Sequence, residues 1–299
     1  MSINNIDLDE LCLLAIDAAL AAGEIIDSYS QYEVDVEYKA VDSSAASQVV
    51  TKVDRQAQAA IIKILQPSCN KYNLALLAEE SADDGLRQQK TAFWCIDPMD
   101  GTLAFINKTA GYSVSIALVA QNGKPLIGVV YDPLELNLYQ AIDGQGAYKN
   151  KQVIRVPALS LQQPLILQTD PSFVEHPWLE QARDGLNEIA QRLGLNGANI
   201  QFKDGAVMNA CNILQQANSC YFKFPRKENS GGSIWDYAAT ACVFNEVNAI
   251  ATDISGFPLE LNRAGTTYMN HRGFLYCGQQ QLADEIIQLY RTLQFGHDA

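Results

Sequence analysis

The chain has 299 residues, of which 48% are hydrophobic and 18% charged, so it can form one large domain or two packed lobes. Its net charge of −13 leaves no cationic surplus for a nucleic-acid backbone, although metal cations could still bridge an acidic protein to a phosphate. No apolar stretch reaches the roughly 18–20 residues of a membrane span, and the first residues lack a signal-peptide pattern. We therefore expect a cytoplasmic protein that binds neither nucleic-acid polymers nor membranes.

The cysteines and histidines narrow the kind of metal site that the chain can form. Seven cysteines are scattered without a C-x-x-C pair, and we expect them to be small buried apolar residues. The three histidines are far apart in the sequence, which argues against a histidine-rich zinc site. Any metal should therefore be a hard cation with oxygen ligands.

The hydrophobic pattern predicts a layered α/β protein. A helix over 8–29, capped by Asp7 or Asp9, is followed by a helix over 52–65 that Pro67 ends. The centre of the chain predicts strands at 74–77 and 93–96 and a β-meander over 112–149. The second half alternates between strands expected at 164–168, 219–224, 249–252 and 274–277 and helices expected at 178–193, 206–217, 234–246 and 280–294. We expect an N-terminal lobe of residues 1–155, a C-terminal lobe of residues 156–299, and an active site between them.

The segment Asp97-Pro98-Met99-Asp100 is the strongest candidate for a metal site. Proline biases Asp97 towards an extended conformation, and a turn there can direct both carboxylates and the Met99 carbonyl into one hollow. Hard cations such as Mg²⁺ bind oxygen ligands of this kind. Gly101 permits close backbone approach, and Thr102 adds a hydroxyl. Alone, the segment is equally consistent with an ordinary Asp-Pro turn.

Three other acidic residues could complete such a site, and each also has a purely structural explanation. Glu79 follows an apolar strand, where a solvated acidic loop is also common. Asp236 lies three residues after Ser233, which is the spacing of a helix capping box. Asp54 lies in the first turn of a predicted helix, where the helix dipole favours an acid. None of them is decisive alone.

The combination of these segments resembles the inositol monophosphatase superfamily. The order is a strand followed by Glu79-Glu80-Ser81, then Asp97-Pro98-Met99-Asp100-Gly101-Thr102, then Trp235-Asp236 with Ala238-Ala239. The resemblance runs over roughly residues 10–280 and implies a sandwich of alternating αβαβα layers. It also implies a lithium-sensitive phosphatase that uses two or three Mg²⁺ ions to hydrolyse a phosphate monoester.

The same resemblance implies a role for each site residue. Glu79 should be a metal ligand, Asp97 should bridge two metals, and the Met99 carbonyl should bind one of them. Asp100 and Asp236 should complete the second metal site. Asp54 and Thr102 should form a hydrogen-bonded pair that activates the attacking water, and the amides of Gly101 and Thr102 should hold the phosphate.

The substrate is less clearly indicated. Phe105-Ile106, Gly123-Lys124-Pro125 and Pro225-Arg226 look most like the 3'(2'),5'-bisphosphate nucleotidases, which would imply 3'-phosphoadenosine 5'-phosphate. The segment Gly205–Asn209 departs from that branch, because it lacks a serine and a lysine. Candidate substrate-binding residues are Lys223, Arg226, Lys227 and Glu228, although the three cations could equally be solvated surface charges. Alternatives are an inositol-1-monophosphatase and a catalytically silent regulatory relative, either of them a monomer or a homodimer.

Overall fold

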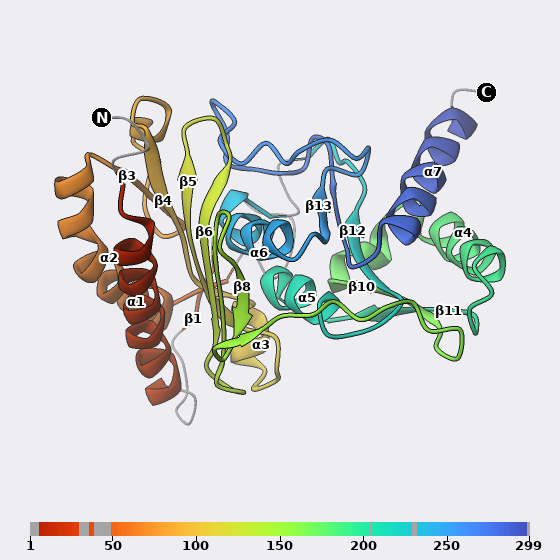
Figure 1. The fold of residues 1–299 in the computed structure, drawn as a ribbon, viewed down its shortest axis with the longest axis horizontal. Helices are drawn as coiled ribbons and strands as arrows, with labels where there is room; N and C mark the ends of the chain where they lie inside the picture. The colour runs from red at the N-terminus through yellow and green to blue at the C-terminus, as the bar shows by residue number, and fades with distance from the viewer. Residues whose placement is uncertain (1–5, 30–35, 39–48, 204, 229–231, 298–299) are drawn as a thin grey trace.

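The computed structural model describes residues 6–29, 36–38, 49–203, 205–228 and 232–297. Figure 1 shows five layers, in which two sheets alternate with three layers of helices. Helices α1 and α2 cover the outer face of the first sheet, α5 and α6 lie between the sheets, and α4 and α7 cover the second sheet. The predicted αβαβα sandwich is confirmed. The lobe boundary near residue 155 stays a prediction.

The outer helices α1 (Leu8–Tyr29) and α2 (Lys52–Tyr72) pack on each other, and α1 also packs on the first sheet. Ala15, Ala18 and Ala22 of α1 are fully buried, which allows close approach. The α1 helix begins after Asp7, whose Oδ1 accepts a hydrogen bond from the Glu10 N–H at 3.0 Å. Asp7 is therefore the cap of the two candidates.

The prediction that Pro67 ends the second helix is wrong. Helix α2 continues through Pro67 to Tyr72. Proline removes one backbone donor, but Ser68, Cys69 and Tyr72 are buried in the turn that follows. The indole Nε1 of Trp94 donates to Ser68 Oγ at 2.9 Å, so packing against the sheet holds this last turn in place.

The first sheet has seven strands in the order β3-β4-β5-β6-β7-β8-β9. Only β3 and β4 pair in parallel within it, and the remaining neighbours are antiparallel. Because helices cover both faces, β4 and β5 are buried along their whole lengths. The strands are β3 (Ala75–Ala78), β4 (Ala92–Asp100), β5 (Ser113–Ala120), β6 (Pro125–Asp132), β7 (Asn137–Ile142), β8 (Gly146–Lys149) and β9 (Gln152–Val153).

The second sheet has five strands in the order β11-β10-β12-β14-β13. Strand β10 pairs in parallel with β11 on one side and β12 on the other, and the other pairs are antiparallel. The half-exposed edge strand β11 was not predicted, although Ala198, Ile200 and Phe202 alternate with polar residues as in a half-buried strand. The strands are β10 (Leu165–Thr169), β11 (Ala198–Phe202), β12 (Ser219–Lys223), β13 (Ile250–Thr252) and β14 (Phe274–Cys277).

The remaining elements connect or cover these sheets. The helix predicted at 206–217 ends earlier than expected, at Ile213. A small β1–β2 ladder, the short helix α3 and two 3-10 helices were not predicted. The elements are β1 (Val36–Tyr38), β2 (Val49–Thr51), η2 (Leu86–Gln88), α3 (Thr102–Ile106), η3 (Pro171–Glu175), α4 (Leu179–Arg192), α5 (Ala206–Ile213), α6 (Ile234–Glu246) and α7 (Gln280–His297).

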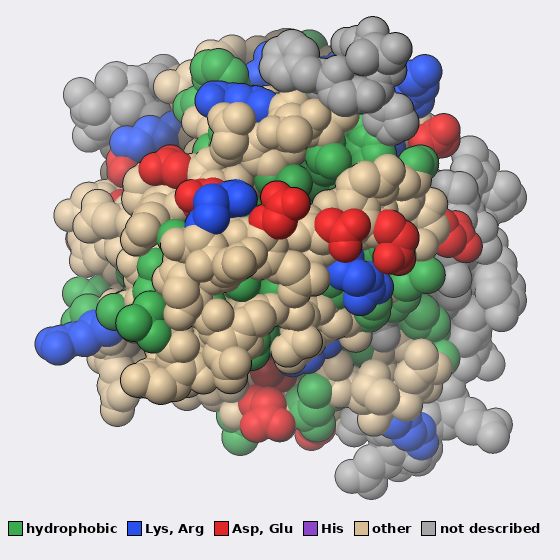
Figure 2. All heavy atoms as spheres, turned by 90° about the vertical axis from the view of Figure 1, so that its right-hand side faces the viewer, with side chains coloured by type: hydrophobic (Ala, Val, Ile, Leu, Met, Phe, Trp, Pro, Cys, Tyr) green, Lys and Arg blue, Asp and Glu red, His purple; other side chains and the backbone are tan. Residues whose placement is uncertain are grey.

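The described surface carries the charged side chains of both signs that the composition predicts. The face that carries α4 and α7 shows acidic and basic side chains interspersed (Figure 2). Arg192 of α4 pairs with Glu188 and Glu285. Within the described ranges, no helix is long and apolar enough to cross a membrane. All seven cysteines are buried and free, as predicted.

Candidate metal centre

Strand β4 carries Asp97 and Asp100 to the same side of the first sheet. Residues three apart on a regular strand point to opposite faces. Here Asp97 pairs with Ser115 and Asp100 with Ser113, so three steps along β4 match two along β5. This extra residue is a β-bulge, and it brings the two carboxylates into one hollow. The expected turn is thus the bulged end of a strand. At the bulge, Pro98 does not have to donate a backbone hydrogen bond to the neighbouring strand.

Asp100 joins the strand end to helix α5. Its Oδ1 accepts from the Ala206 N–H at 3.1 Å, and its Oδ2 accepts from the Val207 N–H at 2.8 Å. These are the first two N–H groups of the helix, so Asp100 supplies the cap that Gly205 lacks. The segment 205–209, which departs from the nucleotidase pattern, therefore lies directly against the acidic cluster.

Asp236 enters the cluster from the first turn of α6. The Ser233 N–H donates to Asp236 Oδ2 at 2.6 Å, so the capping-box explanation is confirmed. Ser115 Oγ of β5 donates to the Trp235 carbonyl at 3.0 Å and ties this helix start to the first sheet. Because a carboxylate has two oxygens, capping a helix and facing the cluster are compatible roles for Asp236.

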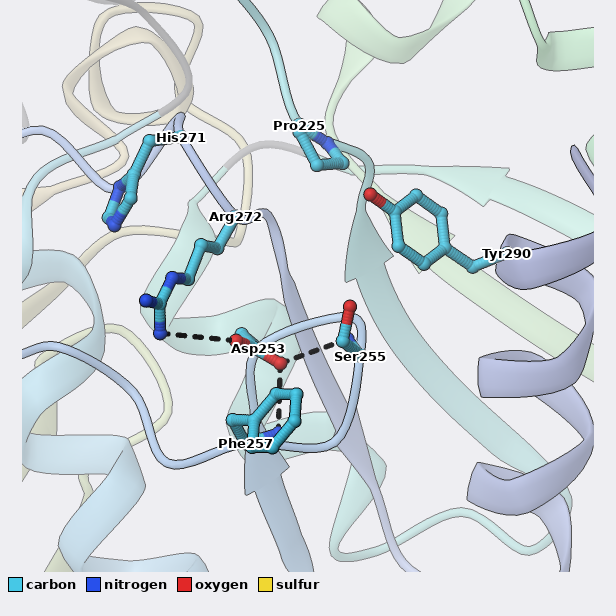
Figure 3. A pocket seen from close by; sticks show the side chains of 7 residues that line it. All are labelled: Pro225, Asp253, Ser255, Phe257, His271, Arg272 and Tyr290. Atoms are coloured by element: carbon cyan, nitrogen blue, oxygen red, sulfur yellow. Dashed lines mark hydrogen bonds and ion pairs between the residues drawn. The ribbon is translucent and has the colours of Figure 1, made fainter. Parts of the chain in front are cut away.

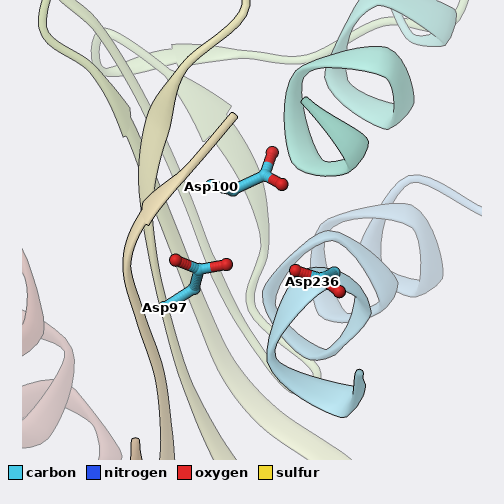
Figure 4. A group of neighbouring side chains, drawn as sticks. All are labelled: Asp97, Asp100 and Asp236. Carbon is cyan, nitrogen blue, oxygen red and sulfur yellow. The ribbon is translucent and has the colours of Figure 1, made fainter. Parts of the chain in front are cut away.

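The three carboxylates converge between β4 and the helices (Figure 4), and one oxygen from each lies within 4.8 Å of the others. Burial, and then the charges of Glu79, Asp236 and Asp100, raise the pKa of Asp97 well above its usual value. Burial and Asp236 raise the pKa of Asp100, although its two backbone donors oppose the rise. This donor set fits a hard divalent cation, because cations would relieve the repulsion among buried oxygen ligands.

Of the other predicted site residues, Glu79 and Thr102 lie next to the cluster, since the charge of Glu79 acts on Asp97 and Thr102 bonds to Met99. Glu79 follows β3, with its N–H bonded to the Ile96 carbonyl at 3.1 Å. Asp54 is buried in the first turn of α2. Thr102 begins α3, and its hydroxyl donates to the Met99 carbonyl at 3.1 Å. Since a hydroxyl has one proton, pairing Thr102 with Asp54 as predicted requires its Oγ1 proton to turn away from Met99.

A search of known families matches residues 7–294 to the model described as the inositol monophosphatase family. The chain belongs to this family. Its members are phosphatases, so the predicted superfamily and enzyme class, a metal-dependent phosphomonoesterase, are both confirmed.

Individual relatives agree with this assignment. The chain is 30% identical over 258 residues to Nus factor SuhB of Vibrio cholerae, covering 86% of each chain. It is 27% identical over 293 residues to inositol monophosphatase 2 of Rattus norvegicus, covering 97% of this chain and 93% of the relative. A crystal structure of SaIMPase-II with inositol monophosphate superposes with a TM-score of 0.69 at 23% identity, covering 97% of this chain and 95% of that one.

The candidate substrate residues of this inositol monophosphatase family member lie at the end of β12 and in the segment that follows it. Lys223 is not a surface charge: it is the last residue of β12, is 8% exposed and forms an ion pair with Asp170. Arg226 is half-buried and donates to the Ser172 carbonyl at 3.0 Å. Lys227 and Glu228 are exposed.

Asp170 was missed in the sequence, although Asp170-Pro171 follows a buried strand as Asp97-Pro98 does. Its side chain also accepts from the Ser172 N–H at 2.9 Å. Burial alone would raise the pKa of Asp170, but the Lys223 ammonium and the Ser172 donors hold it below its usual value. The repeated pattern of a buried strand ending in Asp-Pro is the signal that could have found it.

A separate cavity of about 380 Å³ shares no residue with the acidic cluster. Figure 3 shows Arg272 pointing towards Asp253 within it, at 3.8 Å, and Arg272 also pairs with Glu260 at 3.1 Å. The cavity therefore has no net positive charge for binding a phosphate. Its lining residues are Pro225, Asp253, Ser255, Phe257, His271, Arg272 and Tyr290.

Proposed function

We propose that this phosphatase hydrolyses a small phosphate monoester at the acidic cluster with two or three Mg²⁺ ions. The observation that carries the proposal is the convergence of the buried carboxylates of Asp97 and Asp100 with the half-buried carboxylate of Asp236. Burial and the neighbouring acids raise the pKa values of Asp97 and Asp100. When bound, divalent cations supply positive charge that offsets the carboxylates and stabilises the phosphoryl group during displacement. The proposed ligands are Glu79, Asp97, the Met99 carbonyl oxygen, Asp100 and Asp236.

Within this proposal, Asp54 and Thr102 orient and deprotonate the attacking water, and the backbone at Gly101 and Thr102 holds the phosphate. Because Asp54 is buried, its carboxylate is held in one position and shielded from solvent, which suits a base that acts on a single water. The Thr102 hydroxyl is anchored through Met99, the residue between the two aspartates, so it can orient a water next to the cluster.

Replacing Thr102 with alanine should reduce turnover by about 10²-fold, because a positioned acid–base group typically contributes that much. Mg²⁺ affinity, measured by calorimetry, should stay close to wild type. Thr109→Ala is the matched control, since Thr109 also donates to a carbonyl, that of Ala104 at 3.3 Å. Full activity in Thr102→Ala would contradict the water-activating role.

The substrate proposal rests on the Asp170–Lys223 pair. The connection after β10 leads to β11 on one side, whereas β12 lies on the other side, so β10 and β12 border a topological switch point. Ligands of open α/β sheets bind at the carboxyl ends of strands at such points. Asp170 and Lys223 lie at these ends, and the charges of Asp170, Asp100 and Asp236 all help to raise the pKa of buried Tyr221.

The Asp170–Lys223 ion pair has no net charge and suits hydroxyl groups of a substrate. Its carboxylate accepts hydrogen bonds and its ammonium donates them. It does not suit a second phosphate, which needs uncompensated positive charge. We therefore propose a polyol monophosphate such as inositol 1-phosphate, which agrees with the names of the relatives. The bisphosphate nucleotide predicted from the sequence is the second candidate, supported by the nearby Pro225-Arg226 segment.

A comparison of phosphate release under identical Mg²⁺ tests this choice. We expect kcat/KM for inositol 1-phosphate to exceed that for 3'-phosphoadenosine 5'-phosphate by at least about 10²-fold, because an unmatched phosphate would be left without a partner. The double variant Asp170→Asn/Lys223→Met, which leaves no orphaned charge, should lose this preference but keep hydrolysis of p-nitrophenyl phosphate. Lys227→Met is the exposed control. A preference for the nucleotide would reverse the assignment.

Other properties remain proposals. Lithium inhibition and a monomeric or homodimeric state follow from the sequence resemblance, whereas a cytoplasmic location is the expectation drawn from the sequence pattern. The alternative to an enzyme is a regulatory protein without catalysis. The name of the relative Nus factor SuhB is consistent with this alternative. Absence of Mg²⁺-dependent turnover on a broad panel of phosphate monoesters would favour that alternative.

A further inference from the structure

Arg87 is a buried cation that lies outside the acidic cluster and is only 2% exposed. It belongs to the 3-10 helix η2, between β3 and β4, and its Nε donates to Asp83 Oδ2 at 2.8 Å. The rest of its guanidinium reaches a segment about 175 residues later in the chain. Nη1 donates to Asn262 Oδ1 at 2.7 Å and to the Arg263 carbonyl at 2.9 Å, and Nη2 donates to the Thr266 carbonyl at 3.2 Å.

Asn262 strengthens the same junction from the other side. Its carbonyl and side-chain oxygens accept from Gln88 Nε2 at 3.0 and 2.8 Å. Its Nδ2 donates to the carbonyls of Gln121 at 2.8 Å and Arg87 at 3.2 Å. The segment 262–266 is therefore fastened to two connections of the first sheet, one before β4 and one after β5.

Each of the joined segments leads to a predicted metal ligand. Asp83 lies four residues after Glu79. On the other side, the Thr267 carbonyl accepts from the Ile234 N–H at 2.9 Å, at the start of the helix that carries Asp236.

We propose that Arg87 is a positioning residue that sets the separation between the Glu79 segment and the Asp236 helix, and thereby the affinity for Mg²⁺. The inference rests on the proposed metal site. A forked guanidinium can bind a carboxylate, an amide and two carbonyls at once, whereas a lysine ammonium is a single point of charge. Lysine at this position would keep the charge but leave some of these buried acceptors without a donor.

Calorimetric titration of Mg²⁺ into the full chain without substrate tests this role. Arg87→Lys should raise the dissociation constant for Mg²⁺ about tenfold, as loss of a partner behind a metal ligand commonly does. At saturating Mg²⁺, kcat should fall by no more than about twofold, because the ligands themselves are intact. Arg192→Lys, which alters a surface pair with Glu285, is the matched control and should leave the affinity unchanged.

The outcomes separate this inference from the proposed function. If Arg87→Lys does not fold, Asn262→Ala is the second test, because it removes one acceptor of the guanidinium and leaves the bonds of the guanidinium to Asp83, Arg263 and Thr266. This variant should raise the dissociation constant about threefold. A folded variant with lower thermal stability but unchanged Mg²⁺ affinity overturns the positioning role. A wild-type chain that binds no Mg²⁺ overturns both proposals, whereas one that binds Mg²⁺ but hydrolyses no phosphate monoester overturns only the proposed function.

Discussion

Replacing Asp97 with asparagine should abolish hydrolysis while making the metal-free protein more stable. Asparagine keeps an oxygen that can accept from the Met99 N–H, as Asp97 Oδ1 does at 3.0 Å, so the bulge should survive. It removes the negative charge that the proposed metals need, and loss of such a preorganised group costs on the order of 10³-fold in turnover. Mg²⁺ should no longer raise the unfolding temperature, because the affinity that links binding to stability is lost.

The stability gain follows from the direction of the pKa shift. Burial and the neighbouring acids raise the pKa of Asp97 in the folded protein, so above the unfolded value of 3.8 the unfolded chain releases this proton first. In the metal-free wild type, stability contributed by protonated Asp97 is therefore present at acid pH and is lost as pH rises towards the raised folded value. Asparagine does not ionise, so the variant should lose less stability than wild type between pH 4 and neutral pH.

Thermal unfolding in chelator across that pH range measures the effect. Asp143→Asn is the control, because Asp143 is a surface carboxylate paired with Lys124 at 2.5 Å. If metal-free Asp97→Asn is less stable than wild type at neutral pH, favourable contacts of the Asp97 carboxylate outweigh its repulsion by the neighbouring acids. Retained turnover would remove Asp97 from the site.

The sequence predicted the members of the site better than their arrangement. Asp97, Asp100 and Asp236 stand out because they follow or begin strongly patterned elements, and most of those elements form where predicted. The β-bulge that lets Asp97 and Asp100 share a face depends on pairing with Ser113 and Ser115, which no local pattern reveals.

Long-range contacts explain what the sequence could not show. Lys223 resembles a surface cation in the sequence, because its partner Asp170 is far away in the chain and becomes its neighbour only when β10 and β12 pair. Arg87 sits in a polar stretch that predicts a solvated loop, yet the segment 262–266 buries it. In both cases the decisive quantity is burial, which depends on segments that a local window does not include.

Replacing Gly205 with alanine should give the largest loss of stability among changes near the site. Gly205 has a φ of +81° and a ψ of 110°, a combination that L residues rarely adopt and that costs an alanine about 1–3 kcal/mol. A Cβ atom there would also lie 1.8 Å from the Gly111 carbonyl oxygen and 3.2 Å from Asp100 Oδ2. Forcing these groups apart adds about 1–3 kcal/mol, so we expect a total loss of about 2–6 kcal/mol in the free energy of unfolding.

The same change should weaken Mg²⁺ binding, because the N–H groups of Ala206 and Val207 hold both oxygens of Asp100. Gly197→Ala is the control for a positive φ: Gly197 has a φ of +78°, but a Cβ atom there would meet nothing within 4 Å. It should lose only the conformational part, about 1–2 kcal/mol, and keep its Mg²⁺ affinity. Urea unfolding and Mg²⁺ titration of the two variants separate backbone strain from the clash with Gly111. Equal losses in both would mean that Gly205 is required for its conformation alone, and that the contact with Gly111 does not hold Asp100 in place.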